Sequence, residues 1–219
     1  MRLPSWLGGT QIKTRTDLLN YLVGVFGYRD YLEIGVRDRR HNFDKIRVTG
    51  VAHGCDPAPR RAISHTMTSD AFFAERTSTS GAPYDLVLVD GLHVAEQVER
   101  DVDNALAHLT PNGSVVLHDC NPQTEAAQVE DYKYGEHWNG NVWKAWVKLR
   151  ATRPDLAMWV VDIDEGCGVI RRGTQATISV PSVAFADLDY AYLTRERRAA
   201  LNLVSVADFQ AAIAPAATA

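Results

Sequence analysis

The chain has 219 residues, of which 46% are hydrophobic and 23% charged, and its formal net charge is −4 at neutral pH. This length suits one large domain, and the apolar fraction excludes a chain that is disordered throughout, because enough surface can be buried to offset the entropy lost on folding. The acidic balance and the lack of a long basic run argue against a protein that tracks the phosphates of nucleic acid, so we expect no nucleic-acid partner.

The cysteines and the apolar stretches indicate the compartment. Cys55, Cys120 and Cys167 are an odd number without a CxxC pair, which argues against a disulfide framework or a zinc ribbon and predicts free thiols. No stretch approaches about 18 apolar residues, and Met1–Gly9 lacks the pattern of a signal peptide. We therefore expect a cytoplasmic protein that makes no membrane contact.

The first half of the chain alternates amphipathic stretches with short apolar runs. Apolar residues at helical spacing predict a helix over Thr14–Phe26, and a helical piece is expected around Ser69–Glu75. Strands are expected at Tyr31–Val36, Val48–Cys55 and Tyr84–Val89, the last of which is apolar on both faces.

The second half continues the alternation. Val94–Leu109 carries one apolar stripe opposite charged residues and predicts an amphipathic helix. A turn is expected at Thr110–Gly113 and a strand at Ser114–Leu117. The remaining expected elements are a helix at Asn141–Arg150, a strand pair at Ala157–Asp162 and Gly166–Arg171, and a helical segment at Tyr190–Ala212. Apolar strands that alternate with helices predict a parallel α/β sheet.

Polar residues close four strands in a row. They are Glu33 and Gly35, Asp56, Asp90 and His93, and finally His118 and Asp119. Ligands of an open parallel sheet bind outside the carboxyl ends of its strands. Glu33-Ile34-Gly35 lacks the further glycines of the GxGxxG dinucleotide fingerprint, which weakens the case for NAD or FAD. Asp56 stands where a carboxylate can accept hydrogen bonds from both ribose hydroxyls, although a turn glycine followed by a capping aspartate would give the same pattern.

The ordered set YLEIGV, GCDPAP, YDLVLVDGLH and LTPNGSVVLHDCNP resembles the class I S-adenosylmethionine-dependent methyltransferases, and among them the metal-dependent sugar O-methyltransferases. The resemblance covers roughly residues 30–172. It implies one Rossmann-like domain over residues 1–219, with a core at 28–172 and a helical C-terminal extension at 173–219. The core would hold a central, mostly parallel seven-stranded sheet flanked by helices.

The resemblance also implies a cofactor site. Glu33 and Gly35 are expected to contact the methionine end of S-adenosylmethionine, and Asp56 its ribose. Ser69, within the segment MTSD, falls where the family contacts the adenine side. Asp90 is expected to serve both the cofactor and a metal ion.

Asp90, His118 and Asp119 form a candidate site for Mg²⁺ or Mn²⁺, because carboxylate oxygens and an imidazole on neighbouring strands suit these ions. The related sugar methyltransferases place a carboxylate or carboxamide where His118 stands, which shifts the preference slightly toward Mn²⁺. The alternative is structural: Asp119 caps the following loop, and His118 is hydrogen-bonded internally.

Two histidines are candidate bases. His93 follows Asp90 by three residues and can project into the same crevice, and a neutral imidazole can take the proton of a hydroxyl acceptor. His137 is the second candidate and lies in the aromatic stretch Tyr132–Trp146, expected to form a flap over a saccharide. The loop residues of this stretch are candidates for the acceptor site, whereas Trp143 and Trp146 are expected in the core. The acceptor-site candidates are Tyr134, Glu136, His137 and Trp138.

The sequence thus favours methyl transfer from S-adenosylmethionine to a carbohydrate hydroxyl, with the 1-hydroxyl of a methylated mannoside in polysaccharide biosynthesis as one candidate acceptor. A phenol or another small-molecule hydroxyl is the alternative acceptor. A metal-dependent hydrolase would need further ligands such as an HxxxH pair, which the sequence lacks. A non-catalytic interaction module on the same scaffold stays open, and the Ala-rich C-terminal third could supply the face of a homodimer.

Overall fold

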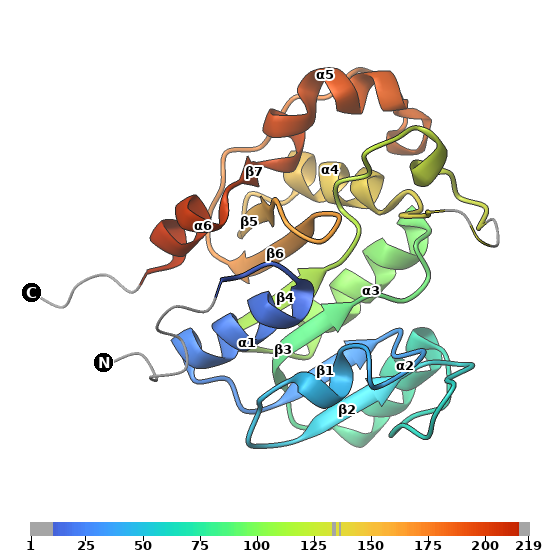
Figure 1. Ribbon diagram of the computed structural model, residues 1–219, viewed down its shortest axis with the longest axis vertical. Coiled ribbons are helices and arrows are strands. Elements are labelled where there is room, and N and C mark those ends of the chain that lie inside the picture. Colours follow the sequence, from blue (N-terminus) through green and yellow to red (C-terminus); the bar gives the residue numbers. More distant parts are fainter. Residues whose placement is uncertain (1–10, 133–134, 136, 215–219) are drawn as a thin grey trace, which may run out of the picture.

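The computed structural model describes residues 11–132, 135 and 137–214. A single sheet runs through the molecule with helices on both of its faces (Figure 1). Its strand order is β2-β1-β3-β4-β6-β5-β7. The strands are β1 (Tyr31–Ile34), β2 (Ala52–Cys55), β3 (Tyr84–Val89), β4 (Leu109–Leu117), β5 (Leu156–Val161), β6 (Cys167–Arg172) and β7 (Leu203–Val204).

The sheet is mostly parallel. Only β6 runs antiparallel to its two neighbours, β4 and β5, while the other neighbouring pairs are parallel. The α-helices are α1 (Arg15–Phe26), α2 (Ser69–Thr79), α3 (Ala95–Ala107), α4 (Val142–Thr152), α5 (Tyr190–Leu201) and α6 (Val206–Ile213). The described residues also form short 3₁₀ helices, namely η2 (Phe43–Lys45), η3 (Ala126–Gln128) and η4 (Phe185–Asp187). This arrangement confirms the expected Rossmann-like α/β fold with seven strands.

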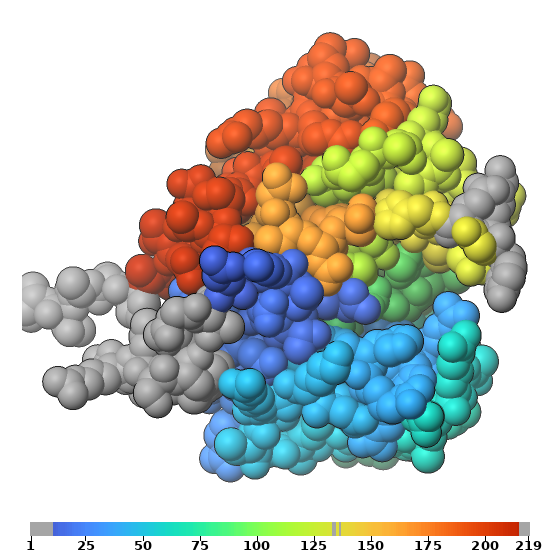
Figure 2. All heavy atoms as spheres, in the orientation of Figure 1, coloured from blue at the N-terminus to red at the C-terminus, as the bar shows by residue number. Residues whose placement is uncertain are grey.

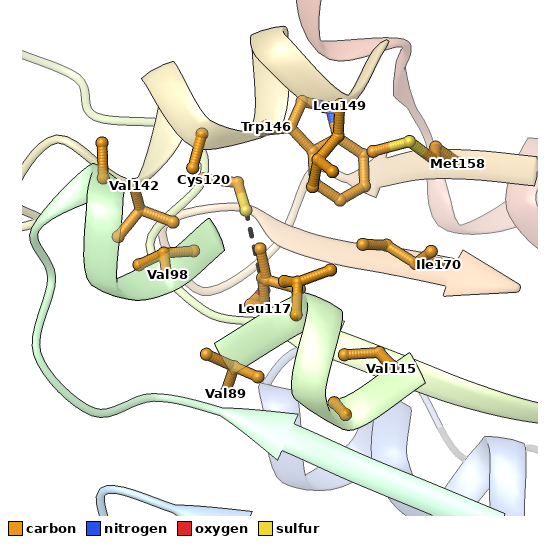
Figure 3. Packing of buried hydrophobic residues seen from close by; sticks show 14 of the residues in the cluster. Val89, Val98, Val115, Leu117, Cys120, Val142, Trp146, Leu149, Met158 and Ile170 are labelled. Carbon is orange, nitrogen blue, oxygen red and sulfur yellow. Dashed lines mark hydrogen bonds between the residues drawn. The ribbon is translucent and has the colours of Figure 1, made fainter. Parts of the chain in front are cut away.

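The core has two layers because the strands are apolar on both faces. Residues of α1 and α6 pack on one face of the sheet, and residues of α2, α3, α4 and α5 pack on the other. Figure 3 shows the second layer, where Trp146 and Leu149 of α4 lie beside Met158 and Ile170 of the sheet. Trp143 and Trp146 are fully buried, as expected from their helical spacing. The three cysteines are free and buried, which confirms the prediction of free thiols.

The strand expected at Val48–Cys55 is shorter and begins at Ala52. Two further predicted elements differ in kind from the structure. Thr110–Gly113 is not a separate turn but lies within β4, where the pairing with β3 shifts from Tyr84–Leu109 to Leu86–Ser114 and leaves these residues as a bulge. Tyr190–Ala212 is not one helical segment. Asn202 adopts the left-handed conformation (φ 49°) that ends α5, and Leu203–Val204 then pairs with β5 before α6 begins.

The segment after residue 172 therefore adds a strand as well as helices to the fold, because β7 forms one edge of the sheet.

The first helix starts from a capping box. The Thr14 side chain accepts from the Asp17 amide, and the Asp17 carboxylate accepts from the Thr14 amide at 3.0 Å. Among the described helices, none is both long and apolar enough to span a bilayer.

Candidate active site

A cavity of about 810 Å³ opens at the carboxyl ends of β1, β2, β3 and β4. It lies where β1 has β2 on one side and β3 on the other, which is the point at which open α/β sheets bind ligands. Figure 2 shows the surface hollowed between the blue and cyan residues below and the green and yellow residues above. Nine residues were predicted for the cofactor, the metal and the base, and eight of them line this cavity, namely Glu33, Gly35, Asp56, Ser69, Asp90, His93, His118 and Asp119.

Gly35 brings the ends of β1 and β3 together. Its φ of +90° is a conformation that side chains rarely adopt. A Cβ atom at this position would lie 2.0 Å from the carbonyl oxygen of Asp90. The Gly35 amide donates to the Cys55 carbonyl at 2.8 Å, which also holds the loop to β2. The glycine is therefore required for the backbone approach that shapes the cavity floor.

Glu33 is buried beside Gly35 and accepts hydrogen bonds from two neighbours. The Tyr31 hydroxyl donates to Oε2 at 2.6 Å, and Asn42 Nδ2 donates to the same oxygen at 2.8 Å. Burial raises the pKa of Glu33 to about 7, although both hydrogen bonds and the distant Arg15 cation act in the opposite direction. The Glu33 carboxyl can therefore change its charge near neutral pH when a cation approaches.

The Asp56 carboxylate holds the two loops that flank the cavity. Its Oδ2 accepts from the Arg37 amide at 2.9 Å, and its Oδ1 accepts from the Ala58 amide at 2.7 Å. This is the capping role that the sequence offered as an alternative. The half-buried side chain still lines the cavity, so loop capping and ligand binding share one carboxylate.

Ser69 begins α2 and is tied to α3. Its hydroxyl accepts from Gln97 Nε2 at 3.2 Å, and the same amide nitrogen lies 3.0 Å from Asp101 Oδ1. Burial raises the pKa of Asp101 to about 6. Gln97 lines the cavity as well and was missed from the sequence, because a glutamine within a helical pattern carries no signal of its own.

Two imidazoles and two carboxylates meet at the ends of β3 and β4. His93 Nε2 lies 3.3 Å from Asp90 Oδ1, and His93 Nδ1 lies 3.2 Å from Asp119 Oδ2. His118 Nδ1 contacts the same two carboxylates at 3.2 and 3.1 Å. The structure thus brings together all the residues predicted for the metal and the first candidate base. Asp119 has a left-handed backbone (φ 61°), which turns its side chain after β4.

Arg15 and Asp164 complete this cluster and were missed from the sequence. Arg15 Nε lies 3.4 Å from Asp90 Oδ2, and Arg15 Nη1 lies 3.3 Å from both His118 Nε2 and Asp164 Oδ2. Asp164 also accepts from the Arg15 amide at 2.8 Å, which ties the turn between β5 and β6 to the start of α1. Arg15 starts a helix and does not stand at a strand end. Asp164 does follow the carboxyl end of β5, which runs in the direction of β1–β4, but the sequence indicated only a strand pair there and not a further strand of the parallel sheet.

The electrostatics of the cluster suit a divalent cation. Burial alone would raise the pKa of Asp90, but the His118 and Arg15 cations hold it well below its usual range. Burial would lower the pKa of His118, but Asp90, Asp119 and Asp164 raise it well above its ordinary value. With His118 protonated, as this raised pKa implies, three carboxylates, one imidazolium and one guanidinium leave an excess of one negative charge. The excess becomes two when His118 gives up its proton.

The donor atoms also fit a cation. One ligand atom from each of Asp90, His93 and Asp119 lies within 4.8 Å of the others. His93 Nδ1 is buried without a hydrogen-bond partner of its own. Carboxylate oxygens with one imidazole are a ligand set that Mg²⁺ and Mn²⁺ accept. The residues present therefore fit the metal that the sequence resemblance implies.

Among the described rings of the aromatic stretch before α4, the Trp138 indole contacts this cluster directly. The Trp138 indole is stacked on the His93 imidazole, with ring centroids 4.9 Å apart and an interplanar angle of 11°. Tyr132 meets Trp138 edge to face at 5.3 Å, and both rings line the cavity. His137, the second candidate base, is 61% exposed, pairs with Glu165 Oε2 at 3.2 Å and is not among the residues that line the cavity. Tyr134 and Glu136 lie outside the described residues.

The match to known proteins covers this same part of the chain. Residues 32–120 match the family model of a methyltransferase domain. They include β1 to β4 almost completely, and with them the strand ends that line the cavity.

Three solved structures share the fold. An O-methyltransferase from Bacillus cereus in complex with SAH is 14% identical, and the match covers 77% of this chain and 82% of that one with a TM-score of 0.52. The O-methyltransferase TomG from Streptomyces achromogenes, in complex with SAM, is 16% identical over 74% and 80% of the two chains with a TM-score of 0.50. An SAH-bound methyltransferase from Podospora anserina is 14% identical over 73% and 78% with a TM-score of 0.51.

A curated relative, the uncharacterized protein y4gI from Sinorhizobium fredii, is 30% identical over 98 residues. This match covers 40% of the present chain and only 9% of the relative. The chain therefore spans a small part of that protein's length. At these identities the structural comparisons show the fold of S-adenosylmethionine-dependent O-methyltransferases.

Proposed function

We propose that this chain transfers the methyl group of S-adenosylmethionine to a hydroxyl group of a small carbohydrate acceptor, with the help of a divalent cation. One observation carries the proposal. The cavity lies where β1 has neighbours on both sides, and residues suited to binding S-adenosylmethionine stand at the ends of β1 and β2. A cluster of carboxylates and imidazoles stands at the ends of β3 and β4 of the same cavity. The cavity volume of about 810 Å³ is within the range of sites that enclose a cofactor and a small acceptor.

The residues after β1 and β2 would bind the cofactor. Gly35 lines the cavity and has no side chain of its own, so a ligand there could approach its backbone closely. Asp56 offers a carboxylate to the ribose hydroxyls, and Ser69 marks the end of the cavity formed by α2. Glu33 would face the cationic methionine end, where an approaching ammonium or sulfonium group would favour its ionised form.

The cluster after β3 and β4 would activate the acceptor. A sugar hydroxyl is a weak nucleophile because its pKa lies far above neutral, so its proton must leave as the methyl group is transferred. His93 lies inside the cavity between Asp90 and Asp119, and as a neutral imidazole it can accept that proton. The two aspartates flank the ring and would stabilise the imidazolium that forms.

Asp90 and Asp119 would hold the divalent cation. When bound, the ion would lower the pKa of the acceptor hydroxyl and orient it. His118, the third predicted ligand, contacts the same carboxylates, but its Nε2 faces Arg15 and Asp164. The spacing of the donor atoms would also let His93 serve as the third ligand. A Mn²⁺ titration of the two histidine variants distinguishes these roles, as described in the Discussion.

The acceptor class rests on the rim of the cavity near His93. Leu92 and Tyr132 line the cavity and are 56% and 52% exposed, and the Tyr132 ring contacts that of Trp138. Aromatic and apolar surfaces of this kind pack against the apolar faces of sugar rings, and they would pack against a phenol as well. We propose the carbohydrate because the histidine–carboxylate cluster also supplies polar partners for neighbouring hydroxyls.

The test is a transfer assay with labelled S-adenosylmethionine and Mg²⁺ or Mn²⁺, in which mannosides with a free 1-hydroxyl, other saccharides and catechols are compared. The proposal expects label in a saccharide ether and none with acceptors whose hydroxyls are blocked. Label in catechols alone would replace the carbohydrate by a phenol. Absence of binding of S-adenosylhomocysteine in calorimetry would overturn the methyltransferase proposal itself.

A further inference from the structure

We propose that the segment Trp138–Asn141 is a positioning element that fixes His93 and Asp119 relative to each other. This inference rests on the proposed function for its catalytic meaning, but its structural part stands on contacts alone. The segment lies between the aromatic stretch and α4, far in sequence from both groups. Each of its four residues contacts His93, its helix or Asp119.

The first pair of contacts involves the His93 ring and backbone. Trp138 covers the imidazole with a nearly parallel indole, and its own Nε1 donates to the Val129 carbonyl at 2.7 Å, which fixes the plane of the ring. Gly140 follows with φ +62°, and a Cβ atom there would lie 2.1 Å from the His93 carbonyl oxygen. The backbone of the segment therefore packs directly on the backbone of His93.

Asn141 holds the start of the helix that follows His93. Its amide donates to the His93 carbonyl at 3.0 Å, and its Oδ1 accepts from the Ala95 amide at 2.6 Å. Val94 is the N-cap residue of α3, and its side chain cannot accept a hydrogen bond. Asn141 therefore caps the helix from a distant part of the chain. His93 is thereby held at its ring by Trp138 and at its carbonyl group by Asn141.

Asn139 holds the carboxylate. Its Nδ2 donates to Asp119 Oδ1 at 2.6 Å, and its backbone amide donates to the Ala127 carbonyl at 2.8 Å. The other oxygen of Asp119 faces His93 and His118. Since Asn139 is fully buried, this hydrogen bond is shielded from water, and it selects one orientation of the carboxylate.

The consequence is that Trp138 acts through His93. A catalytic base displaced by about 1 Å can cost a factor of about 100 in rate, so a ring that fixes the imidazole plane contributes to kcat. A residue that only bound the acceptor would instead change KM. Trp138 is therefore a positioning residue, and Asn139 has the same role for Asp119.

The experiment compares Trp138→Leu, which loses the stacked ring, with Trp138→Phe, which keeps one. The matched control is Trp159→Leu. Trp159 lies on β5, does not line the cavity, and has a half-buried indole that contacts the aromatic ring of Phe209 on α6. The NMR signal of the His93 ring, assigned from its loss in His93→Ala, reports the stacking without any assay. We expect Trp138→Leu to move this signal downfield as the ring current is lost, and Trp138→Phe and Trp159→Leu to move it far less.

The kinetic arm uses the same variants. Trp138→Leu should lower kcat at least about tenfold with KM for the acceptor nearly constant, and Trp138→Phe should recover most of the loss. In the His93→Ala background the same substitution should change the residual rate less than about twofold, since groups that act through one another are not additive. Asn139→Asp, which keeps the shape but turns a carboxylate toward Asp119, should lower kcat at least about tenfold and leave the His93 signal in place.

Several outcomes would overturn the inference. These are an unmoved His93 signal in Trp138→Leu, a pure rise in KM, or equal losses with and without His93. Failure of the proposed function is recognised separately, because then the wild type would bind no S-adenosylhomocysteine, while the NMR comparison would still decide whether Trp138 fixes the His93 ring.

Discussion

The Cα atom of Gly35 lies so close to Asp90 that a Cβ atom would stand 2.0 Å from the Asp90 carbonyl oxygen. This contact joins the strand end proposed to bind the cofactor to the strand end proposed to bind the metal. Because the close approach is made by backbone atoms, a neighbouring side chain cannot relieve it by changing its rotamer. The geometry of the whole cavity therefore depends on this glycine.

Gly35→Ala is expected to lower the free energy of unfolding by at least about 3 kcal/mol, because a left-handed backbone strain and a steric clash add. Gly27→Ala is the matched control, since Gly27 also has a positive φ (+69°) but no atom within 4 Å of its Cβ position. That variant should lose about 1 kcal/mol. Urea unfolding of the two variants measures the difference, and equal losses would show that the Asp90 contact is not limiting.

Asp56→Asn should weaken the binding of S-adenosylhomocysteine by about 1.5–3 kcal/mol, because a charged acceptor is lost from the ribose hydroxyls. Asparagine keeps an oxygen for the Ala58 amide, but its NH2 group would face the Arg37 amide, so urea unfolding of the variant must first show that the fold is retained. Calorimetry provides the measurement, and Asp155→Asn, an exposed aspartate paired with Arg153, serves as the control. An unchanged dissociation constant would restrict Asp56 to its capping role.

Removal of the metal should abolish transfer. Activity is expected to vanish in EDTA and to return with Mg²⁺ or Mn²⁺. Asp90→Asn and Asp119→Asn should each weaken Mn²⁺ binding at least about tenfold, since each loses a charged ligand. Electron paramagnetic resonance of Mn²⁺ measures this loss directly. Full activity in chelator would end the metal proposal.

His93→Ala distinguishes a role of His93 as the catalytic base from a role as a metal ligand. If His93 is the base, kcat should fall by a factor of about 10²–10⁴ while the Mn²⁺ affinity is retained. Loss of Mn²⁺ binding in this variant would assign His93 to the metal instead, and retained Mn²⁺ binding in His118→Ala would then exclude His118 as a ligand. A near-normal kcat in His93→Ala together with a loss in His137→Ala would transfer the base to the second candidate.

The raised pKa of Glu33 predicts that the free energy of unfolding depends on pH. Its pKa is about 7 in the folded protein against an ordinary value of 4.5, so between these values the folded state binds a proton that the unfolded state has released. Stability should therefore fall as the pH rises through this window, by about 3 kcal/mol from Glu33 alone. Glu33→Gln should show a shallower decline in urea unfolding between about pH 5 and pH 8. The raised pKa of Asp101 also makes stability fall as the pH rises, but it does so equally in the wild type and in Glu33→Gln, so the comparison is unaffected. Parallel pH curves would contradict the assignment.

The rule that parallel strands present their carboxyl ends to a ligand explains why most of the site was predictable. Asp56, Asp90 and Asp119 stand just after apolar runs and Glu33 stands near the end of one, which made their placement visible in the sequence. Arg15 starts a helix, so only tertiary packing brings it to the cluster. Asp164 follows β5 at the same edge of the sheet, but the sequence alone did not show that β5 runs in the direction of β1–β4.

Element boundaries were harder to predict for a similar reason. Pro111 and Gly113 indicate a turn, yet pairing with β3 on both sides keeps them in β4 as a bulge. Leu203 and Val204 looked like part of a helix because only their pairing with Val160 and Val161 makes them a strand. Trp138 was expected to contact the acceptor, and its stack on His93 depends on a fold that joins β3 to the segment before α4.

Binding of S-adenosylhomocysteine tests the central claim most directly, because it requires no knowledge of the acceptor. At a ligand concentration about 100 times the dissociation constant, the free energy of unfolding should rise by about 2.7 kcal/mol. For a chain of this size that corresponds to an increase in the melting temperature of roughly 5–10 °C. The rise should be markedly smaller for Asp56→Asn at the same concentration. No change in the melting temperature of the wild type at any soluble concentration would contradict the account.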